Sequence, residues 1–141
     1  MRVLFDTNII LDVLLGRAPH VAPATVLLDR VAAKTLDGLL GATTLTTIHY
    51  LATKAVGTRT AQRHIRTLLG LFEVAPVTRA VLTDALDLAL VDFEDAVLHE
   101  AARHAGAEAI VTRDPKGFAA ARLKLYAPDE LVRFLAAAPE A

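Results

Sequence analysis

The sequence contains no cysteine, which excludes disulfide bonds and thiolate metal sites. It has no basic excess either, because 15 Lys and Arg residues stand against 16 Asp and Glu residues, for a formal net charge of −1. Affinity for a polyanion must therefore come from locally placed Arg or Lys and from metal ions. No apolar run is long enough to cross a bilayer, and the apolar start at Val3–Phe5 is broken by Asp6 and Asn8. These absences predict a protein of the reducing cytoplasm that does not contact the membrane.

Apolar residues are abundant: they make up 54% of the 141 residues, and the mean hydropathy is +0.43. Either a second subunit or a partner covers part of this surface, or the value reflects the many alanines, which form helices and need little burial. Both explanations stay open. The length fits one domain, and no linker, repeat or low-complexity tract divides it, so we predict a single domain over residues 1–141.

Short apolar segments alternate with longer stretches of helical periodicity, which predicts an α/β sandwich with a short, mostly parallel sheet. The expected strands and short apolar segments are Val3–Phe5, Leu39–Ala42, Leu71–Val74, Ala109–Val111 and Leu123–Tyr126. The expected helices are Ile9–Leu15 capped by Asn8, Ala22–Ala33, a helix from a Thr43 or Thr44 cap to Gly57, Thr58–Leu69, a helix from a Thr78 cap to about Leu90, Phe93–Ala105 opened by Asp92, and Pro128 to about Ala137.

Acidic residues fall where the predicted strands end, at the edge where open parallel sheets bind ligands. Asp6 directly follows the first strand, and Asp114 lies just past the fourth. If those strands are neighbours, both carboxylates face the same crevice. Asp92 and Asp95 begin a helix that should cover this edge; they share a helix face, while Glu94 should point elsewhere.

Carboxylates gathered in this way repel one another, by roughly 4 kcal/mol for a pair about 4 Å apart at an effective dielectric near 20. A site with several of them must hold protons or bind a cation. Oxygen ligands select Mg²⁺ or Mn²⁺. Such ions lower the pKa of a bound water and neutralise charge during in-line attack on phosphate. The acids therefore indicate a phosphodiesterase.

Each acid also has a purely structural interpretation. Asp92 and Asp95 are typical of an N-cap and a first-turn acid that the helix dipole favours. Asp114 before Pro115 is typical of a turn. Asp6 is the most informative acid, since a charge directly after a buried strand is unfavourable unless it is used. The acids expected on solvated helix faces are Asp12, Asp29, Asp84 and Asp87.

Four stretches carry a resemblance to a known family: Leu4–Asp12, Thr44–Leu51, Asp92–Ala96 and Ile110–Phe118. In this order and spacing they resemble the PIN-domain nucleases and, within that family, the VapC-like toxins of type II toxin–antitoxin pairs. Each stretch is short, so the specificity comes from the combination. The resemblance covers nearly the whole chain.

The resemblance implies a three-layer α/β/α sandwich with a Mg²⁺ or Mn²⁺ site that cuts single-stranded RNA. It implies that Asp6, Asp95 and Asp114 hold the metal, with Asp92 completing the acidic cluster and Asn8 supporting Asp6. It also implies a homodimer and a cognate antitoxin protein that buries a segment over the active site.

Two positions depart from the family pattern. Many relatives place a Glu on the middle helix, where this chain has only threonines and His49; of these, Thr47 is the candidate to hold a metal-bound water. Relatives also often have Asn at the position of Asp114 and an acid where Gly117 stands. Either Asp114 takes over the acidic role, or the site lacks one ligand.

Basic residues near the acids are candidates to hold RNA phosphates. Arg113 and Lys116 flank Asp114, and Arg17 and Arg79 are weaker candidates. A lone His beside an apolar helix face is usually structural. No convincing metal-ligand spacing is found for His20, His64, His104 or His99, although His99 lies four residues after Asp95.

The main hypothesis is a metal-dependent endoribonuclease of the toxin type. The first alternative is a catalytically weakened PIN-like module that binds RNA or a partner protein, which the missing Glu on the middle helix and Gly117 favour. A receiver-like regulatory domain ranks last. It needs a phosphoacceptor Asp on a central strand, whereas Leu39–Ala42 is followed by threonines.

Overall fold

The computed structural model describes residues 1–90, 92–118 and 121–138. Its strands are β1 (Arg2–Phe5), β2 (Asp37–Gly41), β3 (Glu73–Ala75), β4 (Ala109–Val111) and β5 (Lys124–Tyr126). Its helices are α1 (Thr7–Leu14), α2 (Val21–Ala32), α3 (Ala42–Val56), α4 (Thr58–Leu71), α5 (Arg79–Asp87), α6 (Phe93–His104), the 3₁₀ helix η1 (Pro115–Phe118) and α7 (Pro128–Ala137). Within the described ranges, no helix has the length and apolar character needed to cross a membrane.

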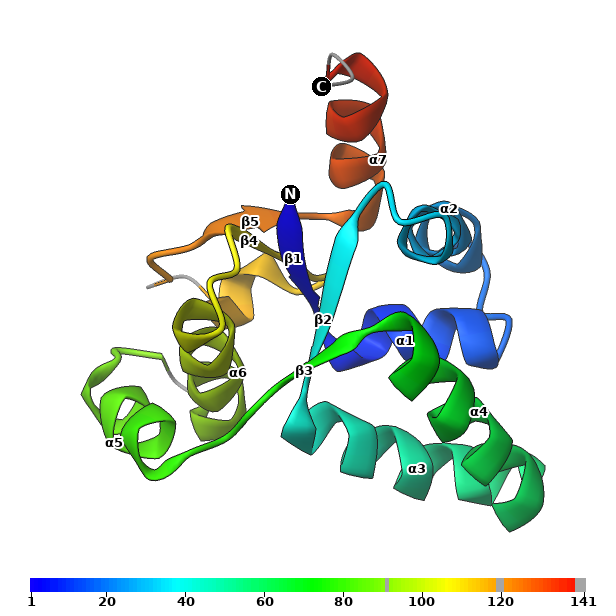
Figure 1. Ribbon diagram of the computed structural model, residues 1–141, viewed down its shortest axis with the longest axis horizontal. Coiled ribbons are helices and arrows are strands. Elements are labelled where there is room, and N and C mark those ends of the chain that lie inside the picture. The colour runs from blue at the N-terminus through cyan, green and yellow to red at the C-terminus, as the bar shows by residue number, and fades with distance from the viewer. Residues whose placement is uncertain (91, 119–120, 139–141) are drawn as a thin grey trace.

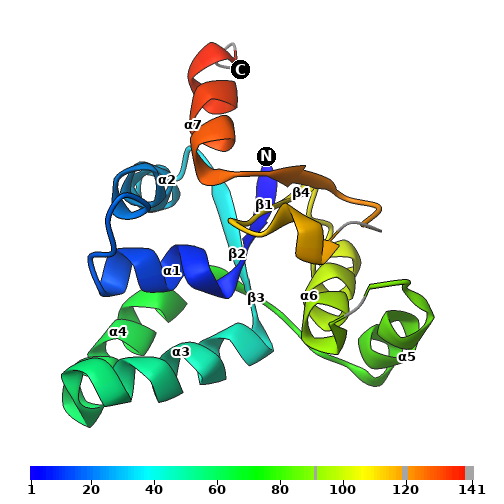
Figure 2. The same ribbon diagram turned by 180° about the vertical axis from the view of Figure 1, so that it is seen from behind.

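The strands form one sheet in the order β3-β2-β1-β4-β5, and every neighbouring pair is parallel. Helices cover both faces, because successive side chains of a strand point to opposite sides. Val3 and Phe5 of β1 pack with residues of α1, α2, α3, α4 and α7. Leu4 packs on the other face with α5 and α6, and Figures 1 and 2 show these two helical layers on either side of the sheet. The predicted three-layer fold is confirmed.

The register of the central strands sets up the carboxyl edge of the sheet. β1 lies between β2 and β4, and Phe5 is paired with Val111. One residue further, the Asp6 N–H donates to the Val111 carbonyl at 3.0 Å. β2 ends at Gly41, directly before α3. The residues that follow β1, β2 and β4 therefore meet at one edge, which α6 borders from the second helical layer (Figure 2).

Two predicted helix starts are wrong. Asp6, not Asn8, caps α1, because its side chain accepts the first amide N–H of the helix. α3 begins directly after Gly41 without a side-chain cap, so Thr43 and Thr44 lie inside its first turn instead of before it. In both cases the helix starts as soon as the strand ends, which leaves no room for the expected capping loop.

The α4–β3–α5 region also differs from the prediction. α4 runs through Leu71 and ends only where Phe72, 5% exposed, enters the core, so β3 begins two residues later than expected. α5 ends at Asp87, before the predicted Leu90. The predicted cap of α6 by Asp92 is confirmed. Residues 139–141 of the predicted domain lie outside the described residues.

Candidate active site

Asp6 is the most enclosed acid at the carboxyl edge, with 8% of its surface exposed. One carboxylate oxygen, Oδ1, accepts the Thr7 N–H at 2.8 Å, and Oδ2 accepts the Thr112 hydroxyl at 2.8 Å. Burial raises the pKa of Asp6; the hydrogen bonds from Thr112 and Thr7 work against this rise, and the charge of Asp114 adds to it. The two hydrogen bonds hold the carboxylate in a fixed orientation.

Asp95 lines the same cavity as Asp6, a space of about 160 Å³. The other residues lining this cavity are Thr7, Asn8, Thr43, Thr44, Thr47, Glu94 and Leu98. Burial, followed by the charges of Asp6, Asp92, Asp114 and Glu94, raises the pKa of Asp95 to about 6. Each of these four neighbouring charges is a carboxylate, so negative charge accumulates around Asp95.

Asp114 approaches Asp95 from the loop after β4. Its N–H donates to the Thr112 hydroxyl at 3.0 Å, and its Oδ1 accepts the Gly117 N–H at 3.2 Å. A Cβ on Gly117 would lie 2.8 Å from Asp95 Oδ2 and 2.9 Å from Asp114 Oδ2. Because both oxygens lie within 3 Å of this one point, they also lie close to each other. The missing side chain of Gly117 leaves the space in which they approach.

The three predicted metal ligands thus come from separate segments to the same edge of the sheet: Asp6 and Asp95 line one cavity, and Asp114 approaches Asp95 beside it. The arrangement is open: over residues 1–90, 92–118 and 121–138, no three His, Asp or Glu side chains lie close enough to enclose a metal ion. An open set of carboxylates still fits Mg²⁺, which keeps several waters and usually takes one or two carboxylates together with substrate phosphate. Oxygen-only donors with raised pKa values, as in Asp6 and Asp95, fit a hard divalent cation.

Of the two other acids at the start of α6, Asp92 caps the helix as predicted, whereas Glu94 lines the cavity, which was not predicted. Asp92 Oδ1 accepts the Glu94 N–H at 2.8 Å and the Asp95 N–H at 3.4 Å, so Asp92 caps α6. Glu94 was predicted to point elsewhere, but it lines the cavity with Asp95. That prediction is wrong because the first turn of α6 sits against the sheet edge, where more than one helix face borders the cavity.

Asn8 and Thr47, the predicted supporting residues, both line the cavity. The Thr47 hydroxyl donates to the Thr43 carbonyl at 3.1 Å, which leaves its oxygen lone pairs available to a water or a substrate group. Sequence reasoning missed Thr44 as a site residue. It is 1% exposed, and its hydroxyl lies 3.0 Å from the Thr7 hydroxyl, which joins α3 to α1 at the cavity wall.

Arg113, predicted to hold a phosphate, is bound to Asp12. Its Nε lies 2.7 Å from Asp12 Oδ2, and its Nη2 donates to Oδ1 at 3.2 Å. Arg17, a weaker phosphate candidate, donates from Nε to the same Oδ1 at 2.8 Å. Asp12 was predicted on a solvated face, which is wrong, since these guanidinium groups cover it and it is 0% exposed. Lys116 is exposed on η1, and Arg79 begins α5.

His99 does not join the acids, although it lies one turn after Asp95 on α6. Its ring is buried, and Nε2 accepts the backbone N–H groups of Arg122 at 3.0 Å and Leu123 at 3.2 Å. The proton therefore resides on Nδ1, which lies 3.2 Å from Glu100 Oε2. Burial lowers the pKa of His99. This histidine ties α6 to the segment before β5.

Comparisons with known proteins agree with this geometry. The PIN domain family model matches residues 2–116. No curated protein matches the sequence. The family match overturns the receiver-like interpretation.

Solved structures share the fold at low identity. VapBC2 from Rickettsia felis, bound to a DNA fragment from its promoter, has a TM-score of 0.71 at 17% identity, over 90% of this chain and 98% of that one. A toxin–antitoxin complex from Klebsiella pneumoniae gives 0.69 at 22%, over 89% and 97%. VapC20 from Mycobacterium tuberculosis, a sarcin–ricin loop cleaving toxin, gives 0.60 at 19%, over 77% and 86%. Because the family model spans most of the sequence, this chain belongs to the PIN-domain family.

Proposed function

We propose that this protein is a metal-dependent endoribonuclease of the toxin type, which hydrolyses RNA phosphodiester bonds. The observation that supports this most is the meeting of Asp6, Asp95 and Asp114 at one sheet edge, where carboxylates dominate the charges acting on Asp95. Acids so placed repel one another unless a cation joins them. Membership of the PIN-domain family adds support, as does the shared fold of a structure described as a sarcin–ricin loop cleaving toxin.

In this proposal Asp6, Asp95 and Asp114 hold Mg²⁺ or Mn²⁺. Such an ion supplies Lewis-acid activation of water and neutralises charge on the phosphate. Asp6 presents its carboxylate in one orientation, because Thr7 and Thr112 hold one oxygen each. Asp95, whose pKa is about 6, gives up any proton it holds when the ion binds.

The surrounding residues have smaller proposed roles. Asn8 and Thr47 offer polar groups to water or substrate at the cavity wall. Asp92 fixes the start of α6 and adds negative charge beside Asp95. Lys116, exposed beside Asp114, is the proposed phosphate contact, and Arg113 is the weaker candidate because it is paired with Asp12.

The direct test is RNA cleavage by purified protein in Mg²⁺ or Mn²⁺. Asp6→Asn keeps the shape and the cap of α1 but removes the charge, so we expect it to abolish cleavage while the circular dichroism spectrum stays unchanged. Asp129→Asn is the matched control, since Asp129 forms an exposed pair with Arg133 on α7. An unchanged cleavage rate in Asp6→Asn refutes the assignment.

The alternative is a catalytically weakened PIN-like module that binds RNA or a partner protein. The absence of a Glu on the middle helix and of an acid at Gly117 favours it, as does the open arrangement of the carboxylates in the part of the chain that the structure describes. A Mn²⁺ titration separates the two functions. A weakened module binds Mn²⁺ poorly and cuts no RNA even at high protein concentration.

The proposed protein partner is an antitoxin that buries a segment over the carboxyl edge. Structures with this fold include VapBC2 and a toxin–antitoxin complex. We expect the product of a short reading frame next to this gene to copurify with the protein and to suppress RNA cleavage. Failure of every adjacent product to bind contradicts this part of the proposal. We propose a cytoplasmic location, because the proposed RNA substrate and this partner are found there.

We also propose a homodimer. Leu82, Leu86 and Phe93 are 39%, 72% and 48% exposed, and they line one groove along α5 and the start of α6. Exposed apolar side chains gathered in one place often mark an interaction surface. A second copy is the proposed occupant because the family resemblance implies a homodimer. Light scattering should show a dimer that Leu86→Lys converts to a monomer; a monomeric wild type refutes the dimer.

A further inference from the structure

Asp12 is a buried carboxylate that the proposed chemistry does not use. It is 0% exposed, and both oxygens face guanidinium groups: Oδ1 accepts from Arg17 at 2.8 Å and from Arg113 at 3.2 Å, and Oδ2 lies 2.7 Å from Arg113 Nε. Replacing buried ion pairs with apolar residues is often neutral or stabilising. A contribution to stability is therefore a weak explanation for the presence of a buried charge at Asp12.

Asp12 joins two segments that are 101 residues apart along the chain. Arg113 stands between Thr112 and Asp114, and both of these neighbours belong to the candidate site. The Thr112 hydroxyl donates to Asp6 at 2.8 Å and accepts from the Asp114 N–H at 3.0 Å. The segment after β4 is thus attached through two consecutive residues. Thr112 binds Asp6 at the end of β1, and Arg113 binds Asp12 of α1.

The attachment at Asp12 also decides where the positive charge of Arg113 lies. Arg113 is the residue before Asp114, and its charge already acts on Asp6. Without the Asp12 carboxylate, the guanidinium keeps no carboxylate partner of its own, and Asp6 is the acid of the site on which its charge already acts. A guanidinium paired with those acids takes the place that a divalent cation needs.

We propose that Asp12 is a positioning residue of the metal site. Through Arg113 it fixes the segment that carries Asp114, and it holds the Arg113 guanidinium away from Asp6 and Asp114. The inference rests on the proposed function, because it takes Asp6 and Asp114 as ligands of the ion.

The test compares Mn²⁺ affinity, by titration calorimetry, with the kcat and KM of RNA cleavage. Asp12→Asn should weaken Mn²⁺ binding by roughly tenfold or more, as is typical when a group supporting a metal ligand is lost. It should lower kcat more than it raises KM. Arg17→Gln is the matched control, since it removes the other guanidinium from Asp12 without touching the β4 segment; Mn²⁺ binding should stay close to wild type.

A double variant tests the charge part of the proposal. Arg113→Gln loses the anchor but leaves no stray charge, so it should weaken Mn²⁺ binding less than Asp12→Asn does. Asp12→Asn/Arg113→Gln should then resemble Arg113→Gln and bind Mn²⁺ better than Asp12→Asn alone. A merely structural role of Asp12 predicts the opposite order, with the double variant the weakest.

Three results overturn the inference: a folded Asp12→Asn that binds Mn²⁺ like the wild type, an equal loss in Arg17→Gln, or a double variant weaker than both single variants. If Asp12→Asn does not fold, Arg113→Gln decides, and wild-type Mn²⁺ affinity there overturns it. Asp6→Asn in the same titration identifies a different failure. Should the wild type and Asp6→Asn bind Mn²⁺ equally, the proposed function falls and this inference falls with it.

Discussion

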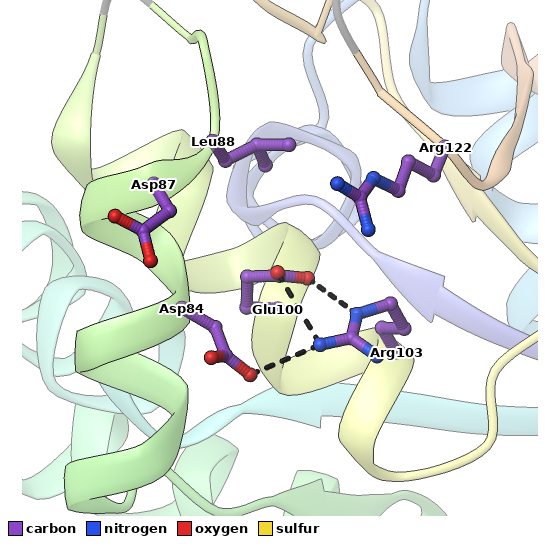
Figure 3. A pocket seen from close by; sticks show the side chains of 6 residues that line it. All are labelled: Asp84, Asp87, Leu88, Glu100, Arg103 and Arg122. Carbon is purple, nitrogen blue, oxygen red and sulfur yellow. Dashed lines mark hydrogen bonds and ion pairs between the residues drawn. The ribbon is translucent and has the colours of Figure 1, made fainter.

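On the α5–α6 face, Arg103 donates to Glu100 at 2.8 Å and to Asp84 at 3.0 Å. At the carboxyl edge of the sheet, by contrast, Asp95 is surrounded by the negative charges of other acids. Figure 3 shows the first arrangement: dashed lines join Arg103 to Glu100 and to Asp84, and Arg122 lines the same cavity of about 170 Å³. Both regions contain enclosed acids. Glu100 and Asp84 have a cation of the chain as a direct partner, whereas the charges that act on Asp95 are those of other carboxylates.

The pKa values follow this difference. Burial raises the pKa of Glu100, but the hydrogen bond and charge of Arg103, with help from His99, outweigh it and lower the pKa overall. At the carboxyl edge nothing outweighs burial, and the pKa of Asp95 rises to about 6. Acids with built-in partners contribute to stability, whereas acids without them destabilise the folded protein unless a cation joins them.

The largest expected effect is the response of the carboxyl edge to metal. Mn²⁺ at about 100 times its Kd should raise the free energy of unfolding of the wild type by about 2.7 kcal/mol, because the ion binds only the folded protein. Asp95→Asn should lose most of this gain. Denaturant unfolding with and without Mn²⁺ measures both.

Glu100→Gln is the control for the metal response, because it changes an enclosed acid of the other region. It should keep the full stabilisation by Mn²⁺. If Glu100→Gln loses the response as well, the ion acts on the whole protein and the contrast between the two regions is wrong.

The next largest effect concerns the stability of the apo protein. Glu100→Gln removes the charge that faces Arg103 and His99, both of which stay in place, so the free energy of unfolding should fall by about 2 kcal/mol. Asp129→Asn breaks an exposed pair with Arg133 and should change it by less than about 0.5 kcal/mol. Equal effects of the two substitutions, measured in urea without metal, contradict a stabilising role for Glu100.

The pH dependence of stability should separate the two regions with a smaller effect. The folded-state pKa of Asp95, about 6, lies above its ordinary value of 3.8, so protonation favours the folded state. Its contribution to stability is fully present below pH 3.8 and is lost as the pH rises through about 6. Glu100 acts in the opposite sense, since its lowered pKa makes stability fall as the pH drops below its ordinary value of 4.5.

Asp95→Asn isolates the first of these contributions. Without metal, this variant should be about 1 kcal/mol more stable than the wild type at pH 7.5, after allowance for solvent screening of a partly exposed group. The difference should shrink as the pH falls toward 4. If the variant is less stable than the wild type at pH 7.5, the ionised carboxyl of Asp95 does not destabilise the folded protein.

The sequence predicts the frame of this molecule well because its signals are local. The apolar triplets Val3–Phe5 and Ala109–Val111 give two central strands, and the polar residue after each gives the carboxyl edge. The register of β1 against β4 places Thr112 beside Asp6. The sequence already indicates this contact, because each of the two residues directly follows its strand. Neighbouring strands that end in polar residues are therefore a usable signal.

What the sequence could not supply is the set of partners that fold in from far away. Asp12 looks like any acid on a helix until Arg113 arrives from the other end of the chain. Its spacing of three residues from the buried Ile9 is the one local signal that places it on an inner face. His99 likewise gains its role only from the backbone of Arg122 and Leu123.

Gly117→Ala is the change with the smallest expected effect on stability, and it sharpens the contrast between the regions furthest. The added Cβ meets the ends of two carboxylates, Asp95 and Asp114, at under 3 Å; both side chains can rotate away, so the free energy of unfolding should change by less than about 0.5 kcal/mol. Rotation separates the two oxygens that the proposed ion joins. Mn²⁺ affinity should therefore fall on the order of tenfold, as when ligand geometry is disturbed.

Gly70→Ala is the matched control for this substitution, because a Cβ there meets nothing within 4 Å. It should leave Mn²⁺ affinity unchanged, and as a helical Gly→Ala change it should stabilise α4 slightly. Calorimetry in Mn²⁺ and unfolding in urea give the two quantities for both variants. If Gly117→Ala binds Mn²⁺ as tightly as Gly70→Ala, then Asp95 and Asp114 do not share an ion, and the negative charge at the carboxyl edge needs another explanation.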